Sequence, residues 1–226
     1  MIKTHKIVIS ASRRTDIPAF YMPWFMGQIR KGYFEVTNPY NQHVSCVPAT
    51  PDRVHTIVFW SKNFGPLLSA RDAFRGYNLF FNFTINSDCP VLEPQVPPLE
   101  ARLAQLELLC NHFSPRCIHW RFDPICFFQT PEGIRDNRGD FEFIADKAYQ
   151  LGIERCVTSF LDLYAKIQKR TATRNSFSFI PPSLEKQKET LLEMQSYLKP
   201  RGIALFTCCE KELLNTLPPK TGILPS

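Results

Sequence analysis

Short apolar runs alternate along the chain with amphipathic segments, and this pattern predicts about six strand–helix repeats. The β-branched run at 7–9 predicts a buried strand, and Leu79, Phe81, Phe83 and Ile85 alternate with more polar neighbours, which predicts another. Further strands are predicted at 33–36, 44–47, 55–60, 117–123, 156–162 and 203–208, and helices at 19–30, 66–75, 97–113, 141–151 and 183–198.

The alternation of strands and helices indicates an α/β fold with mostly parallel strands, because the long connections do not suit hairpins. Several predicted strands carry polar residues on one face. Such a face suits the inside of a barrel better than a doubly wound sheet, whose central strands are apolar on both faces. We therefore expect a TIM-like (β/α) barrel, complete or partial, with about six to seven strands. The 226 residues are expected to form one domain, 1–226.

Polar side chains gather where the predicted strands end, and α/β enzymes place reactive groups at such positions. The residues expected to bind substrate are Arg13, Arg14, Lys62, Asn82, Thr84 and Arg121. The residues expected to carry chemistry are Asp16, Asp123, Asp162, Glu210 and Cys208. An alternative interpretation is that pairs such as Arg121–Asp123 and Arg14–Asp16 are structural ion pairs.

The net charge of +6 favours an anionic small molecule as the partner. Nucleic acid is a second possibility, with the basic run 166–174 as its contact, although a solvated loop explains that run as well. No apolar run reaches membrane-spanning length and no signal peptide is evident, so we expect no membrane contact and a cytoplasmic location.

No metal site is expected from the residues alone. The 8 cysteines contain no C-x2-C pair, which suits small buried thiols in a reducing compartment. The four strand-end carboxylates are ligands of the type that divalent cations prefer, but only His119 joins them on the same predicted face and no H-x-H or H-E-x-x-H occurs.

Seven sequence blocks, in order along 5–215, resemble the signature blocks of an uncharacterised bacterial family, domain of unknown function 1848. The blocks are Ser10–Tyr21, Val36–Tyr40, Ile57–Asn63, Phe81–Thr84, Trp120–Pro124, Thr158–Tyr164 and Thr207–Glu210. The resemblance implies a barrel similar to radical S-adenosylmethionine enzymes, with an iron–sulfur cluster held by a C-terminal C-x3-C-x2-C segment. This chain contains no C-x3-C-x2-C, so we expect it to lack that segment and to be unable to build the cluster alone.

Three hypotheses follow. The leading one is a radical S-adenosylmethionine-like barrel of unknown reaction that binds an anionic ligand at the rim formed by the strand ends. The second is a cluster-free hydrolase or lyase, metal-dependent, that uses the rim carboxylates. The third is a non-catalytic module that binds nucleic acid or a partner protein.

Overall fold

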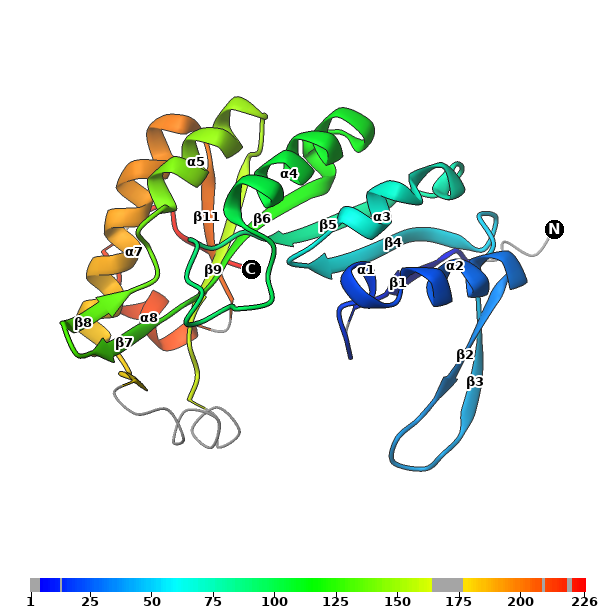
Figure 1. Cartoon of the computed structure of the whole chain (residues 1–226), viewed down its shortest axis with the longest axis horizontal. Coiled ribbons are helices and arrows are strands. Elements are labelled where there is room, and N and C mark those ends of the chain that lie inside the picture. The colour runs from blue at the N-terminus through cyan, green and yellow to red at the C-terminus, as the bar shows by residue number, and fades with distance from the viewer. Residues whose placement is uncertain (1–4, 13, 164–176, 209, 219–220) are drawn as a thin grey trace.

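The computed structural model describes residues 5–12, 14–163, 177–208, 210–218 and 221–226. Its centre is a sheet of seven parallel strands in the order β1-β4-β5-β6-β9-β11-β12 (Figure 1). These strands are β1 (Ile7–Ser10), β4 (Val54–Ser61), β5 (Leu79–Thr84), β6 (Ile118–Ile125), β9 (Arg155–Phe160), β11 (Ala204–Thr207) and β12 (Leu224–Pro225). The predicted parallel α/β sheet is confirmed. Among the described residues β1 and β12 form its two edges and are not paired with each other.

Two small antiparallel sheets flank the main one. The strands predicted at 33–36 and 44–47 are confirmed as β2 (Tyr33–Thr37) and β3 (Val44–Pro48), which pair as an antiparallel hairpin. The second, which the sequence analysis did not predict, contains β7 (Phe127–Thr130), β8 (Gly133–Asp136) and β10 (Ser178–Phe179). Only Cys126 separates β6 from β7, so the hydrophobic pattern contains no break that marks the new strand.

The longer helices follow the predicted segments. They are α2 (Met22–Lys31), α4 (Leu99–Phe113), α5 (Phe141–Gln150) and α7 (Leu184–Leu198); the shorter ones are α1 (Ile17–Phe20), α3 (Gly65–Ser69) and α8 (Lys211–Thr216). Short 3-10 turns occupy Arg71–Phe74, Pro115–Cys117 and Lys199–Arg201. No helix in the described ranges combines the length and the apolar character needed to cross a bilayer.

Prolines and glycines explain where the helices differ from the prediction. The helix expected at 19–30 is two helices, α1 and α2, because Pro23 lies in the first turn of α2 and cannot continue a helix from before it. Gly32 then ends α2 in a left-handed conformation with φ of 81°. The helix expected at 66–75 stops at Ser69 and continues as a 3-10 turn. Ser183 caps α7, since its side chain accepts a hydrogen bond from the Lys186 N–H.

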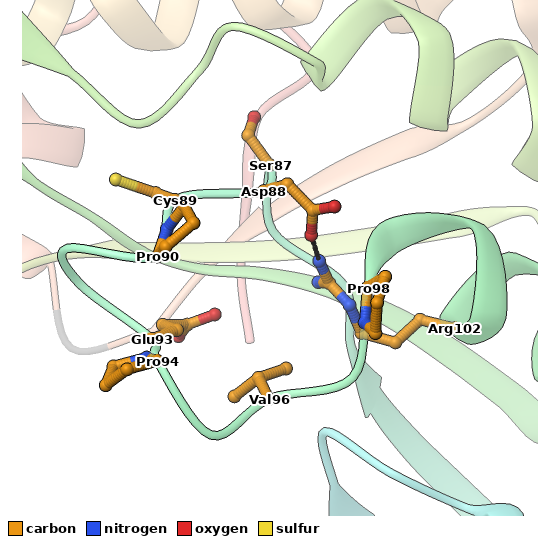
Figure 2. A pocket seen from close by; sticks show the side chains of 9 residues that line it. All are labelled: Ser87, Asp88, Cys89, Pro90, Glu93, Pro94, Val96, Pro98 and Arg102. Carbon is orange, nitrogen blue, oxygen red and sulfur yellow. Dashed lines mark hydrogen bonds and ion pairs between the residues drawn. The ribbon is translucent and has the colours of Figure 1, made fainter.

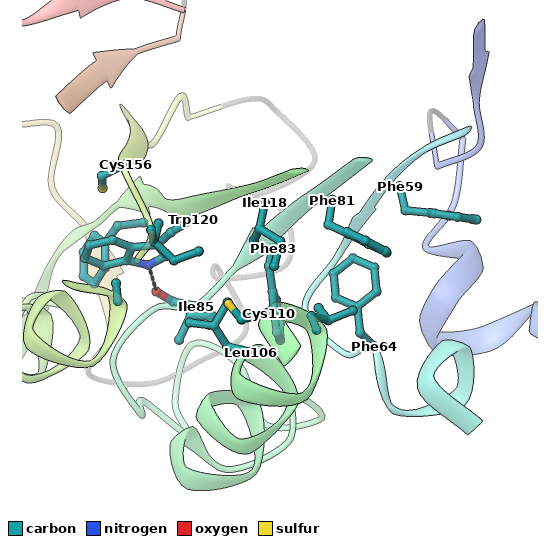
Figure 3. Packing of buried hydrophobic residues seen from close by; sticks show 14 of the residues in the cluster. Phe59, Phe64, Phe81, Phe83, Ile85, Leu106, Cys110, Ile118, Trp120 and Cys156 are labelled. Carbon is teal, nitrogen blue, oxygen red and sulfur yellow. Dashed lines mark hydrogen bonds between the residues drawn. The ribbon is translucent and has the colours of Figure 1, made fainter. Parts of the chain in front are cut away.

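The helices pack on one face of the sheet, and the apolar side chains of alternate strand residues form the core there. Phe25 of α2 contacts Phe59, with 5.3 Å between ring centroids, and Phe141 of α5 contacts Trp120 at 5.6 Å. Figure 3 shows the central part of this core, in which the Trp120 indole N–H donates to the Ile85 carbonyl at 3.0 Å. Each buried aromatic side chain contributes roughly 2–3 kcal/mol by leaving water.

The opposite face, which we call the helix-free face, carries the other set of alternate residues. It includes Trp60, Phe80, Asn82, Thr84, His119 and Arg121, which the strand register places side by side. In the described part of the chain no helix packs on this face. The fold therefore leaves a polar and aromatic surface over the middle of the sheet.

Candidate functional site

Asp16 joins the end of β1 to the end of β4. One carboxylate oxygen accepts the Ala19 N–H at 3.0 Å and caps α1. The other accepts the Ser61 hydroxyl at 2.9 Å and the Lys62 N–H at 3.3 Å. Both oxygens are therefore used in positioning the rim, and a catalytic role for Asp16 stays a prediction.

Lys62, at the end of β4, contacts the carboxylate of Glu93 through its Nζ atom. Burial lowers the pKa of Lys62, and Cys126 and Asp123 oppose that effect. Glu93 lies in the loop 87–98 between β5 and α4, and was not among the sequence-predicted residues. The prolines of this stretch predicted a connection between two elements. The one signal in the sequence that could have pointed to Glu93 is its negative charge, which complements the lysine at the end of the predicted strand.

The loop that carries Glu93 is fixed by Arg102 (Figure 2). The guanidinium of Arg102 is buried and donates to the carbonyls of Asn86 and Pro97 at 2.7 and 2.8 Å and to the carboxylate of Asp88. Burial lowers the pKa of Arg102. Nine residues between Ser87 and Arg102 also line a small cavity of about 130 Å³.

Arg121 and Asp123 of β6 form a bidentate ion pair. Nε and Nη2 of Arg121 donate to one Asp123 oxygen at 3.1 and 2.7 Å, and the other oxygen accepts the Ser159 hydroxyl of β9. The ion-pair interpretation of these two residues is therefore the one that the structure supports. In the described residues, Nη1 of Arg121 has no acceptor and stays available.

Asn82 and Thr84 lie in the middle of the helix-free face. Asn82 is 6% exposed, and neither side chain makes a hydrogen bond to any described residue. The strand register places Asn82 between Trp60 and His119. The Asn82 carboxamide is not among the buried polar groups that lack a partner, so solvent reaches its polar atoms although the residue as a whole is buried.

His119 lies beside Asn82 and packs edge-on against Phe80, with 4.6 Å between the ring centroids. Burial lowers the pKa of His119 to about 4, and the charges of Arg155 and Arg121 add to this effect. The imidazole is therefore neutral at physiological pH, when it presents one donor and one acceptor.

Glu210 and Asp162 lie beyond the ends of β11 and β9. One oxygen of Glu210 accepts the Phe160 N–H at 3.0 Å. Burial raises the pKa of Glu210, and the nearby charges of Asp162 and Asp123 raise it further. Cys208 follows β11 directly, where its backbone N–H donates to Thr158. Catalytic roles for Glu210, Asp162 and Cys208 stay predictions.

The predicted cations do not form one cluster. Arg13 lies outside the described residues. Arg14 is exposed and donates to the Thr37 carbonyl of the hairpin at 3.2 Å. Lys62 and Arg121 each have a carboxylate partner. At the rim, the charges of Lys62 and Arg121 are therefore balanced by carboxylates. On the adjoining helix-free face, the neutral side chains of Asn82 and Thr84 make no hydrogen bond to a described residue.

The cysteines of the described residues do not provide a cluster site. Seven of them are described, and they are spread over the fold. Within the described ranges no three His, Cys, Asp or Glu side chains are grouped so as to hold a metal ion. These residues therefore do not fit the thiolate triad that a radical-enzyme cluster needs.

Comparison with known proteins gives a family but no relative of established activity. No curated protein matches the chain. The family model described as "Domain of unknown function (DUF1848)" matches residues 8–223, nearly the whole length. The chain is therefore a member of the DUF1848 family.

Proposed function

We propose that this protein binds a small polar molecule on the helix-free face, at the carboxyl ends of the parallel strands, as a barrel-type enzyme. The observation that carries the proposal is a set of neighbouring polar groups on that face, the side chains of Asn82 and Thr84 and Nη1 of Arg121, that make no hydrogen bond to any described residue. Solvent reaches the Asn82 carboxamide, so a ligand can take the place of water there. A ligand that both accepts and donates hydrogen bonds satisfies this group.

We propose further that the ligand carries an anionic group and that this group binds beside Arg121. Two nitrogens of Arg121 hold Asp123, and Nη1 is left for the ligand. The carboxylates nearby limit the ligand to one such group, since Asp123 and Glu93 repel a highly charged anion.

The barrel character of the sheet is also part of this proposal. Two observations support it: the strands follow each other in chain order, and the helices pack on one face. A doubly wound sheet reverses its order and has helices on both faces. We propose that the sheet is an open segment of a (β/α) barrel similar to the radical S-adenosylmethionine enzymes. Because the described cysteines do not fit a cluster, no chemical step is assigned to one. The cytoplasmic location stays a prediction.

Thermal unfolding with added compounds tests ligand binding. The probes are sodium phosphate, citrate, adenosine monophosphate and S-adenosylmethionine, added to wild type, Asn82→Leu, Arg121→Ala and the surface control Arg75→Ala. We expect at least one probe to raise the Tm of wild type and Arg75→Ala but not that of Asn82→Leu or Arg121→Ala. Equal shifts in all four proteins, or no shift in any, contradict the proposal.

Acid–base catalysis without a cluster is a second candidate, and the raised pKa of Glu210 favours it. A carboxyl whose pKa is raised by burial is better suited to act as a general acid in a hydrolase or lyase than an exposed carboxyl. Glu210→Gln then abolishes turnover of p-nitrophenyl phosphate or acetate, whereas an inactive wild type argues against this candidate. The nucleic-acid hypothesis rests on 166–174, outside the described residues, and stays a prediction.

A further inference from the structure

The edge strand β1 borders a groove of about 760 Å³ that the proposed ligand site does not use. Its walls come from three elements: β1, the helices α1–α2 and the hairpin β2–β3, which projects beside α2 in Figure 1. Lining residues include Val8, Ser10, Tyr21, Trp24, Phe34 and Val36. The groove therefore lies where one more strand would be added to the sheet.

The backbone of β1 offers hydrogen bonds toward this groove. The N–H groups of Ile7 and Ala11 bond to carbonyls of Arg53 and Val58, on the β4 side. Because backbone groups alternate in direction along a strand, those of Val8 and Ser10 point away from β4. In the described part of the chain no strand pairs with that side of β1. Such an edge is a template for another extended chain.

The walls supply apolar contact on both sides of that edge. Val8 is 62% exposed and Trp24 is 50% exposed, although both are large apolar side chains. Trp24 is held in place by Phe34, with 6.0 Å between the ring centroids. An added strand would cover Val8 with one set of alternate side chains and Trp24 with the other.

Charges at the groove define the chemistry of the occupant. Arg14 follows β1 and contributes a cation at the end where its guanidinium reaches Thr37. Glu35 lies two residues before Thr37 on β2 and contributes a carboxylate farther along the same wall. A complementary strand carries an acidic residue beside Arg14 and a basic residue beside Glu35, with apolar residues between them.

We propose that this groove binds an extended, mainly apolar segment of a partner protein, which pairs with β1 as the next strand and places an acidic side chain beside Arg14. Backbone pairing supplies affinity, and the two charges supply register. This surface is separate from the ligand site on the helix-free face, so either proposal can fail without the other.

Fluorescence anisotropy with synthetic heptapeptides tests the pairing. The peptides alternate valine and threonine between a terminal aspartate and a terminal lysine, in both directions, because parallel and antiparallel addition both fit the edge. A control peptide has lysine at both ends. We expect saturable binding of one Asp/Lys peptide, about two- to fivefold tighter than the control, as an exposed ion pair contributes up to about 1 kcal/mol.

Two variations separate strand pairing from general stickiness. Arg14→Glu reverses the preference, so that the control peptide binds more tightly, which unfolding cannot imitate. N-methylation of either the valines or the threonines removes the donors on one edge of the peptide, so one modified peptide loses binding at least about tenfold while the other retains it. No binding at millimolar peptide, equal binding of all peptides, or retained binding of both N-methylated forms overturns the proposal. The proposal is also overturned if sedimentation velocity shows that the wild type is a dimer and that Val8→Pro is a monomer. In that case a second copy of this chain, and not a partner protein, occupies the groove.

Discussion

Asn82 and Asn86 lie four residues apart along β5 and its extension and are both buried, at 6% and 3% exposed, yet only Asn86 has partners. The Asn86 side chain accepts the Asp123 N–H at 2.9 Å and donates to the Asp123 carbonyl at 3.2 Å. It thereby ties β5 to β6. Asn86 therefore serves the fold, whereas Asn82 makes no hydrogen bond to any described residue and is the residue that we propose binds a ligand.

Leucine substitutions at these positions have different effects on stability. Asn82→Leu changes the free energy of unfolding of the ligand-free protein by less than about 1 kcal/mol, because the solvated Asn82 carboxamide has no hydrogen bond to a described residue to lose. Asn86→Leu lowers it by about 2–3 kcal/mol, because Asp123 loses two hydrogen bonds. Urea unfolding of both variants measures the difference. A loss of stability in Asn82→Leu as large as that in Asn86→Leu would show that Asn82 has a structural partner.

Removing the charge of Asp123 destabilises the rim. In Asp123→Asn the guanidinium of Arg121 remains partly buried without its counter-ion, and we expect a loss of roughly 2–3 kcal/mol. Asp72→Asn is the matched control, because the Arg75–Asp72 pair is 84% and 73% exposed and contributes less than about 1 kcal/mol. Chemical denaturation compares the two. Similar small losses in both variants would mean that solvent screens the Arg121–Asp123 pair.

Glu210 makes the protein less stable as the pH rises. Its folded-state pKa is above the unfolded value of 4.5, so the unfolded state loses this proton first as the pH increases. Glu210→Gln keeps the acceptor for the Phe160 N–H and removes the charge. The variant is therefore more stable than wild type near pH 7.5 and equal to it near pH 4. Urea unfolding at the two pH values checks this, and a variant less stable at pH 7.5 contradicts it.

His119 has the opposite pH dependence. Its folded-state pKa of about 4 lies below the unfolded value of 6.5, so the unfolded state takes up the proton first on acidification. The stability that the neutral imidazole contributes is complete above pH 6.5 and is lost between pH 6.5 and about 4. NMR titration of the ring gives the pKa directly. His119→Gln flattens the stability curve in this window, and an unchanged slope would refute the assignment.

Local signals were sufficient to predict most of the fold. Leu79, Phe81 and Phe83 show the two-residue period of a strand, and Gly32 shows where a helix ends, because each signal lies within a few residues. The hairpin β7–β8 was missed because Phe127 continues an apolar run that began in β6. Where such a strand begins is determined by the strands with which it pairs, and no local sequence pattern marks its first residue.

The site was harder to predict, because the role of each side chain depends on which residues, distant in the sequence, it contacts in the folded protein. The sequence analysis placed Lys62, Arg121, Asp123 and Asn82 near one another, but it treated Asp16 and Arg14 as equal members. Distances show that Asp16 is used as a cap and that Arg14 turns toward the hairpin. Glu93 escaped prediction altogether, since a carboxylate in a proline-rich loop has no feature that identifies its partner across thirty-one residues.

The order of the strands has a consequence for biosynthesis. From β1 to β12, the strands of the main sheet lie side by side in the same order in which they occur along the chain. On the ribosome, every new strand therefore emerges after its partner is already available, and no early strand has to wait for a distant one. The sheet grows from β1 in one direction, so new strands are added at one edge only, while the outer edge of β1 stays open among the described strands from the start.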